Sequence, residues 1–227
     1  MMMWLLAVVG LVGCHDITTD GYDKVTYYPT LNLQEEGEFY VIPVGGNYVD
    51  PGYSSFFNGE DVTSDVNVVS NVNTSEPGMY EVSYSVTSTD GFVLTKVRNV
   101  VVAGTDPLMT DLSGAYKSNI TRVPGGDRGP FTINLGKLAN GLYTVEDFLG
   151  GWYWYGSGYG QSYGYNGVIF VKSSGEVVFI WSNPAVGWSD GANLTSPAYN
   201  AATHTFTWAA KMNAASQYVF NVTLVKQ

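Results

Sequence analysis

The sequence predicts an all-β protein with two domains. Aromatic residues make up 15% of the 227-residue chain, charged residues only 13%, and 27 residues are glycine. This composition is typical of sheets joined by tight, glycine-rich turns. Apolar and polar residues alternate with a period of two in several short stretches, and no stretch keeps the helical period of 3.6. We therefore expect strands throughout both domains.

The first predicted domain covers residues 24–103. Three stretches rich in Val, Tyr and Thr are expected to be strands, namely Val66–Val69, Tyr80–Val86 and Val93–Val102. Turns are expected at Glu76-Pro77-Gly78 and at Thr89-Asp90-Gly91, because glycine tolerates the positive φ of a tight hairpin. These elements predict a small sheet-on-sheet domain.

The order of motifs in this segment resembles the bacterial immunoglobulin-like domains of surface proteins. The motifs are Tyr48-Val49-Asp50-Pro51-Gly52-Tyr53, Asp61-Val62-Thr63, Pro77-Gly78-Met79-Tyr80, Asp90-Gly91 and Arg98-Asn99-Val100-Val101-Val102. The resemblance implies an immunoglobulin-like β-sandwich that acts as a spacer. The alternative function is an adhesive face.

The second predicted domain covers residues 111–227 and follows a linker at 104–110, where Gly104 and Pro107 interrupt the preceding strand. Seven or eight short strands with Gly and Asn turns predict an antiparallel β-barrel or a compact β-sandwich. The expected strands are Gly114–Thr121, Phe131–Leu135, Gly141–Phe148, Val168–Val171, Val177–Trp181, Thr203–Trp208 and Tyr218–Val225.

Charge also separates the two segments. The formal net charge is −10; residues 24–103 carry ten acidic and three basic side chains, whereas residues 104–227 carry seven of each. Two domains with such different charge balances are expected to be separate units. The acidic total argues against nucleic acid as a partner, because phosphates require Lys and Arg.

Motifs of the second segment resemble the C-terminal domain of small Bacteroidetes lipoproteins. They are Asp111-Leu112-Ser113-Gly114, Gly129-Pro130-Phe131, Leu142-Tyr143-Thr144-Val145-Glu146-Asp147-Phe148 and Gly150-Gly151-Trp152-Tyr153. Such proteins are similar to accessory lipoproteins of SusC/SusD-type outer-membrane importers. The resemblance implies an importer partner and a role in the uptake of glycans or peptides.

Cys14 is the only cysteine and follows the short apolar run from Trp4 to Val12. Leu11-Val12-Gly13-Cys14 resembles the lipobox of bacterial lipoproteins. The resemblance implies a signal peptide at 1–13, acylation of Cys14 by fatty chains such as palmitate, and an acidic tether at 14–23. It places the protein in the outer membrane, lipid-anchored and facing the cell exterior. The alternative is a buried cysteine in an ordinary N-terminal helix.

Aromatic residues gather in residues 152–165, which we call the aromatic segment. If Trp152–Tyr155 is extended, its two Trp side chains share one face and its two Tyr share the other. We expect these rings and two later tryptophans to bind a neutral glycan or oligopeptide: Trp152, Tyr153, Trp154, Tyr155, Tyr159, Tyr163, Tyr165, Trp181 and Trp188. Core packing and contact with a partner protein are the alternatives for each ring.

Enzymatic activity is the weaker interpretation, and we predict no catalytic residue, metal site or cofactor. Only His15 and His204 are present, so a Ser-His-Asp triad would depend on His204 alone. Glu146 and Asp147 are adjacent, so on a strand they point to opposite faces rather than across one glycosidic bond. The leading hypothesis is a ligand-capturing surface protein; the others are a purely structural importer subunit and a hydrolase.

Overall fold

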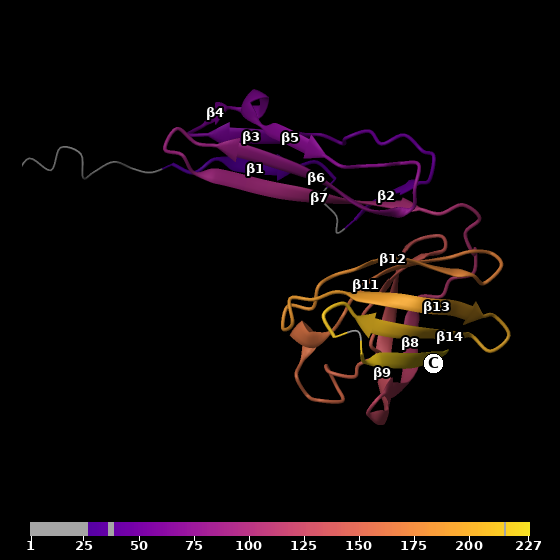
Figure 1. Ribbon diagram of the computed structural model, residues 1–227. Coiled ribbons are helices and arrows are strands. Elements are labelled where there is room, and N and C mark those ends of the chain that lie inside the picture. Colours follow the sequence, from indigo (N-terminus) through magenta and orange to yellow (C-terminus); the bar gives the residue numbers. More distant parts are fainter. Residues whose placement is uncertain (1–26, 36–38, 216) are drawn as a thin grey trace, which may run out of the picture.

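A computed structural model describes residues 27–35, 39–215 and 217–227. The predicted signal peptide, Cys14 and the tether at 14–23 lie outside these residues. The described part consists of strands β1 to β15 and two 3₁₀ turns, which confirms the predicted all-β class. It contains no helix long and apolar enough to cross a bilayer. Two domains lie against each other, with the N-terminal one above the C-terminal one in Figure 1.

The N-terminal domain is a sandwich of two sheets, which confirms the predicted immunoglobulin-like architecture. One sheet has the order β1 (Thr30–Leu33), β3 (Tyr53–Phe57) and β4 (Glu60–Asp61). The other has the order β2 (Tyr40–Pro43), β7 (Val93–Ala103), β6 (Gly78–Thr87) and β5 (Asn67–Ser70). The β2 strand runs parallel to β7, whereas the other pairs are antiparallel.

Alternation along β6 builds the core of this sandwich. Val82, Tyr84 and Val86 are buried, and their neighbours in the sequence turn to the opposite face. Arg98 is also buried, and its Nε donates to the Tyr84 hydroxyl at 3.2 Å. Tyr84 in turn donates to Asp50 Oδ2 at 2.5 Å, so the loop with Asp50 is fixed to the centre of the sheet.

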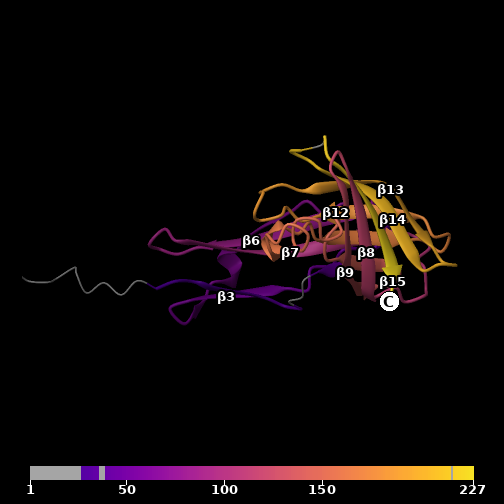
Figure 2. The same cartoon turned by 90° about the horizontal axis from the view of Figure 1, so that it is seen from below.

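The C-terminal domain is one sheet that nearly closes on itself, within the predicted class of barrel or sandwich. All neighbouring strands are antiparallel. Their order is β12 (Val177–Ser182), β11 (Gly167–Val171), β10 (Leu142–Val145), β9 (Gly126–Ala139), β8 (Gly114–Val123), β15 (Val219–Lys226), β14 (Thr205–Met212) and β13 (Ala192–Asn200). Figure 2 shows β9, β8, β15 and β14 side by side along the curved sheet.

The two edge strands of this sheet, β12 and β13, lie close to each other where the sheet nearly closes. Glu176 forms an antiparallel bridge with Ala198, and Ala192 N donates to Ser182 Oγ at 3.2 Å. The β13 strand was not among the strands expected from the sequence, because Pro197 lies in its middle. The pairing of β13 with β14 shifts register between Thr195 and Ala198, and a bulge of this kind accommodates proline on an edge strand.

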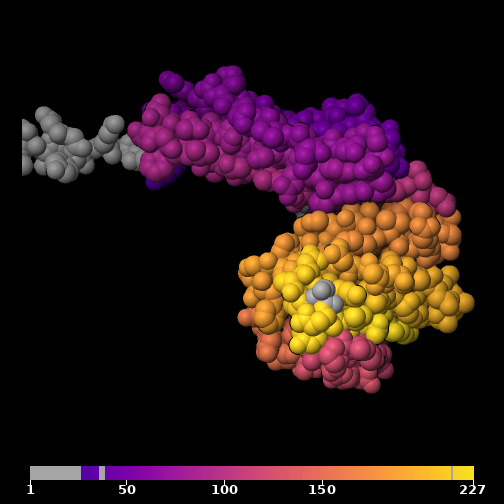
Figure 3. Space-filling model, viewed as in Figure 1, coloured from indigo at the N-terminus to yellow at the C-terminus, as the bar shows by residue number. Residues whose placement is uncertain are grey.

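The two domains share a small apolar core at their junction. Val101 and Ala103 point out of the sandwich and pack with Leu142, Val168 and Phe170 of the C-terminal domain. Strand β11 is therefore buried on both faces, which explains its continuous apolar sequence. Figure 3 shows the N-terminal domain resting on the C-terminal one and extending past it on one side.

Candidate functional site

The Asp147 carboxylate binds the backbone immediately before the aromatic segment and at its end. Its Oδ1 accepts hydrogen bonds from the backbone N–H of Leu149 at 2.9 Å and of Tyr165 at 3.0 Å, and its Oδ2 accepts one from Gly151 at 2.9 Å. Its side chain is fully buried. Burial raises the pKa of Asp147 to about 6, although the three N–H donors act in the opposite direction. One side chain thus joins two residues that lie eighteen positions apart in the sequence.

Residues 148–156 form turns, so Trp152–Tyr155 is not extended and the condition for two alternating faces is not met. Gly150 and Gly151 have φ values of +69° and +94°, which coil the chain immediately before Trp152. The backbone N–H groups of Tyr155 and Gly156 both donate to Gly151 O at 3.0 Å. The rings consequently leave this segment in several directions instead of on two alternating faces.

Trp152 and Tyr165 belong to the core, which corrects their assignment to a ligand-binding surface. Trp152 is 1% exposed and Tyr165 is fully buried. The Trp152 ring lies edge-on to Phe220 at 5.7 Å, and the Arg128 guanidinium lies 4.3 Å from its centre. A small β-domain needs large apolar side chains inside, and these two rings provide them.

Four of the expected rings gather on the surface as one aromatic cluster. The cluster consists of Tyr153, Tyr159, Tyr163 and Trp188. Tyr153 stacks on Tyr159 at 6.0 Å, and Trp188 lies edge-on to Tyr163 at 5.1 Å. Tyr159 is 53% exposed and Trp188 is 41% exposed, so the cluster remains partly open to solvent.

Trp154 and Tyr155 form a second, separate stack. Their ring centres lie 4.7 Å apart with an angle of 11° between the planes. Phe131 also stacks on Tyr155, with ring centres 5.8 Å apart. Tyr155 is exposed at the surface, whereas Trp154 is half-buried. This stack holds the Trp154 ring at the edge of a pocket.

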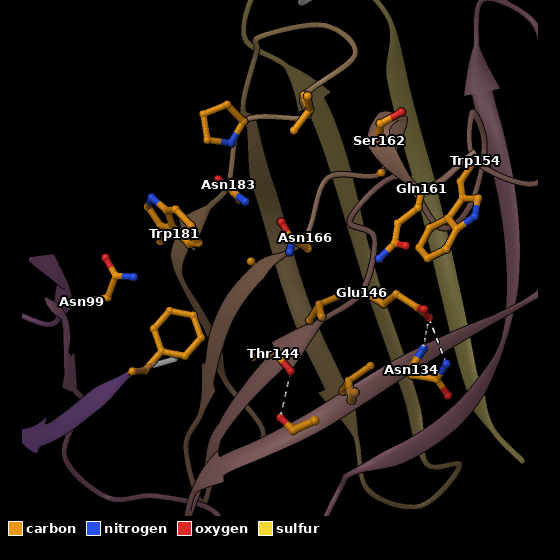
Figure 4. A pocket seen from close by; sticks show the side chains of 18 of the residues that line it. Asn99, Asn134, Thr144, Glu146, Trp154, Gln161, Ser162, Asn166, Trp181 and Asn183 are labelled. Carbon is orange, nitrogen blue, oxygen red and sulfur yellow. Dashed lines mark hydrogen bonds between the residues drawn. The ribbon is translucent and has the colours of Figure 1, made fainter. Parts of the chain in front are cut away.

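The pocket lies at the junction of the two domains and has a volume of about 870 Å³; we call it the interdomain pocket. Figure 4 shows Trp154 and Trp181 on opposite sides of it, with Gln161 and Asn166 between them. The N-terminal domain contributes three of its lining residues, Phe39, Glu81 and Asn99.

Amide side chains are the most frequent polar groups in the lining. Asn134 donates through Nδ2 to Glu146 Oε2 at 3.0 Å. Within the part of the chain that the structure describes, the other four amide side chains make no hydrogen bond to protein, and can bond to solvent or a ligand. They are Asn99, Gln161, Asn166 and Asn183.

The adjacent acids Glu146 and Asp147 do not form a catalytic pair. Glu146 lines the interdomain pocket and accepts from the Asn134 backbone N–H at 2.9 Å, whereas Asp147 is buried in the domain. Nδ1 of His204 lies 3.1 Å from the Tyr199 hydroxyl. Across the described residues, no group of three or more His, Cys, Asp and Glu side chains is placed to hold a metal ion.

Sequence reasoning identified Trp154 and Trp181 as candidate ligand contacts but missed the amides around them. These amides come from strands and loops far apart in the chain, so no local spacing reveals them. The contribution of Phe39, Glu81 and Asn99 was missed for the same reason, because it depends on how the two domains meet.

Two family models cover most of the described chain. Residues 31–102 match the model of a bacterial surface protein, Ig-like domain. The N-terminal sandwich is therefore similar to the Ig-like domains of bacterial surface proteins, and we call it the Ig-like domain. Residues 105–226, more than half of the chain, match the model of a C-terminal domain. The chain belongs to the family that this model defines, the BT2262-like family.

Solved structures give weaker likenesses. The lipoprotein BT2262 from Bacteroides thetaiotaomicron is 29% identical; the match covers 88% of this chain and 100% of that one, with a TM-score of 0.46. Two structures of Clostridium perfringens ZmpB match 53% of this chain at 16% and 18% identity, both with a TM-score of 0.30. The match covers 14% and 28% of those chains. No curated protein matches the chain.

Proposed function

We propose that this protein is a lipid-anchored bacterial surface protein that binds a neutral oligosaccharide in the interdomain pocket. The observation that carries the proposal is the pairing of two tryptophans with four amides that have no hydrogen-bond partner among the described residues. Trp154 and Trp181 lie on opposite sides of the pocket, and the amides lie along the same lining. Aromatic side chains combined with convergent polar groups are typical of ligand sites.

The ring chemistry of the pocket suits sugars. The face of Trp154 that Tyr155 does not cover and the ring of Trp181 offer apolar area on which the apolar face of a sugar ring can stack. The stack on Tyr155 limits the motion of Trp154, so little conformational freedom is lost when a ligand binds. The amides of Asn166 and Gln161 both donate and accept, which matches the hydroxyl groups of a sugar.

The charge of the pocket favours a neutral ligand. Among the described lining residues there is no Lys or Arg, whereas Glu81 and Glu146 are both present. A phosphorylated or acidic ligand would find no counter-charge and would be repelled by these carboxylates. The two carboxylates are compatible with a cationic ligand as well as with a neutral one whose hydroxyl groups donate to them.

The place of action that we propose follows from Leu11-Val12-Gly13-Cys14. Acylation of Cys14 anchors the chain in the outer membrane, and the Ig-like domain lifts the binding domain away from the lipid. The partner that we propose is a SusC/SusD-type importer, to which the bound glycan is delivered.

A second candidate function is contact with such an importer without ligand binding. The observation that favours it is the exposure of Tyr159 and Trp188 in the aromatic cluster. Exposed Tyr and Trp rings are frequent at the centres of protein interfaces. Neither ring belongs to the lining of the interdomain pocket, so the two functions can be separated by substitution.

Calorimetry on the full chain tests the proposal. The probes are cello-, malto- and xylo-oligosaccharides, with short neutral peptides for comparison. We expect one oligosaccharide series to bind, and Trp154→Ala or Trp181→Ala to weaken binding about tenfold or more. Trp188→Ala is the matched control and should bind as the unaltered chain does. Equal losses in all three variants, or binding of peptides alone, would contradict the proposal.

A further inference from the structure

The Ig-like domain lines the interdomain pocket with residues from one face of its larger sheet. Glu81 of β6 and Asn99 of β7 are paired across the two strands, so their side chains point to the same side. This is the side that packs on the C-terminal domain, because the preceding pair on it, Met79 and Val101, belongs to the apolar core at the junction. We call this side of β5, β6 and β7 the outer face.

We infer that the outer face continues the binding site, so that the ligand is an extended neutral oligosaccharide that contacts both domains. This inference rests on the proposed function and deepens it. It gives the Ig-like domain a part in ligand recognition in addition to its role as a spacer.

The pairing of β6 with β7 shows which residues of the outer face follow those in the pocket. Beyond Glu81 and Asn99, the next pairs on the outer face are Ser83 with Val97 and Ser85 with Thr95. Val69 of β5 extends the first of these rows, since it pairs with Ser83. Val69 is 60% exposed and Val97 is 46% exposed, so the C-terminal domain does not cover this part of the face.

The shape of the molecule agrees with this path. In Figure 3 the Ig-like domain extends past the C-terminal domain on one side, and in Figure 1 the extending part contains the hairpin end of β6 and β7. The pocket lies where the two domains meet, and the uncovered face begins beside it. A ligand longer than the pocket can therefore leave it along the outer face.

The chemistry of the outer face fits the same class of ligand. Its residues on the three strands carry small apolar, hydroxyl or amide groups, and Glu81 is the only charged one among them. They are Asn67, Val69, Met79, Glu81, Ser83, Ser85, Thr87, Val93, Thr95, Val97, Asn99 and Val101. Hydroxyl groups and flat apolar rows suit a neutral sugar chain, whereas a polyanion would find no basic side chain there.

The junction holds the two walls in a fixed relation. Phe170 packs under the joint, and a Cβ on Gly104 would lie 2.7 Å from its Cε1, so the chain approaches the ring as closely as glycine allows. Leu108 N donates to Val171 O at 2.9 Å, which ties the segment after the joint to β11. A site with fixed walls loses less entropy on binding than one that must assemble.

The test uses calorimetry on the full chain with the oligosaccharide series that binds, from disaccharide to hexasaccharide. We expect affinity to rise with length, and Asn99→Ala to weaken binding about tenfold. Val97→Lys should weaken binding of the longest probe and leave the disaccharide unaffected. Val123→Lys, an exposed valine of β8, is the matched control and should change neither affinity.

The failure of this inference is distinguishable from the failure of the proposed function. If Trp181→Ala abolishes binding while Asn99→Ala and Val97→Lys bind every probe as the unaltered chain does, the Ig-like domain takes no part and the inference is wrong. If Trp154→Ala and Trp181→Ala bind normally, the pocket is not the site and both proposals are overturned.

Discussion

The Asp147 carboxylate accepts a hydrogen bond from the backbone N–H of Tyr165 at 3.0 Å, and so ties the end of the aromatic segment to a residue that precedes its start. Phe148 N donates to Tyr165 O at 2.8 Å beside it, which doubles the closure. Trp208 Nε1 donates to Phe148 O at 2.8 Å and ties this point to β14. The exposed rings are thus presented from a buried base that the Asp147 carboxylate and these backbone groups hold together.

Replacing Asp147 with Asn should destabilise the protein by about 1–3 kcal/mol, because an amide nitrogen replaces an oxygen that accepts from a backbone N–H. The loss should depend on pH. The folded pKa of Asp147 is raised to about 6, above the value of about 3.9 in an unfolded chain. The folded state therefore holds a proton between these values, and the stability that this contributes is lost as pH rises through about 6.

Urea unfolding of both chains checks this prediction. The difference in unfolding free energy between the unaltered chain and Asp147→Asn should be larger near pH 4 than near pH 7. Glu146→Gln is the control, because Glu146 is the neighbour of Asp147 in the sequence but lines the interdomain pocket. A difference that stays constant across this range would contradict the expected titration.

Gly150→Ala should destabilise the domain more than Gly158→Ala does. Both glycines have a φ of +69°, so the backbone strain of an added side chain is the same. A Cβ on Gly150 would lie 2.6 Å from Ser118 Oγ and 2.7 Å from Ile120 Cγ1, whereas one on Gly158 would have no atom within 4 Å. We expect an additional loss of about 2 kcal/mol at Gly150, measured by thermal or urea unfolding. Equal losses of stability in the two variants would show that backbone strain alone, and not the contacts of the Cβ, causes the loss.

A double-mutant cycle tests the junction between the domains. Gly104→Ala should destabilise the unaltered chain, because its Cβ would meet Phe170 Cε1 at 2.7 Å. In the Phe170→Ala background that ring is absent, and the same change should cost about 1–2 kcal/mol less. Unfolding free energies of the four chains provide the measurement. If the losses in unfolding free energy were additive, a Cβ at residue 104 would have no unfavourable contact with Phe170.

Cys14→Ala should release the protein from membranes. Several fatty chains on one cysteine bind a bilayer firmly, since each buried methylene contributes about 0.8 kcal/mol. Metabolic labelling with palmitate and fractionation of cells are the measurements. Label should enter the unaltered chain and be absent from the variant. An unlabelled chain, or a variant that stays in the membrane fraction, would overturn the proposed anchor.

The sequence predicted those strands in which apolar and polar residues alternate without interruption. The alternation of Val82, Tyr84 and Val86 identified β6 and its buried face. Strand β13 was missed because Pro197 and the left-handed Ser196, with φ of +52°, interrupt the pattern at a bulge. Only pairing with β14, which comes later in the chain, makes this segment a strand.

The candidate site was less accessible to prediction than the fold. Composition identified the aromatic segment, but the direction of each ring depends on contacts between distant residues. Asp147 and the positive φ values of Gly150 and Gly151 turn Trp152 into the core and leave Trp154 at the pocket. The amides and Asn99 come together only when the two domains pack, which no spacing in the sequence reports.

The most direct test of the account locates a bound ligand on the full chain. Hydrogen–deuterium exchange is measured with and without a saturating amount of the oligosaccharide that binds. The account predicts slower exchange of backbone amides in the segments 161–166 and 181–184, which contribute most of their residues to the lining of the interdomain pocket, and no change in the turn at 201–204. Saturation without protection of the pocket segments, or protection confined to the turn, would contradict it.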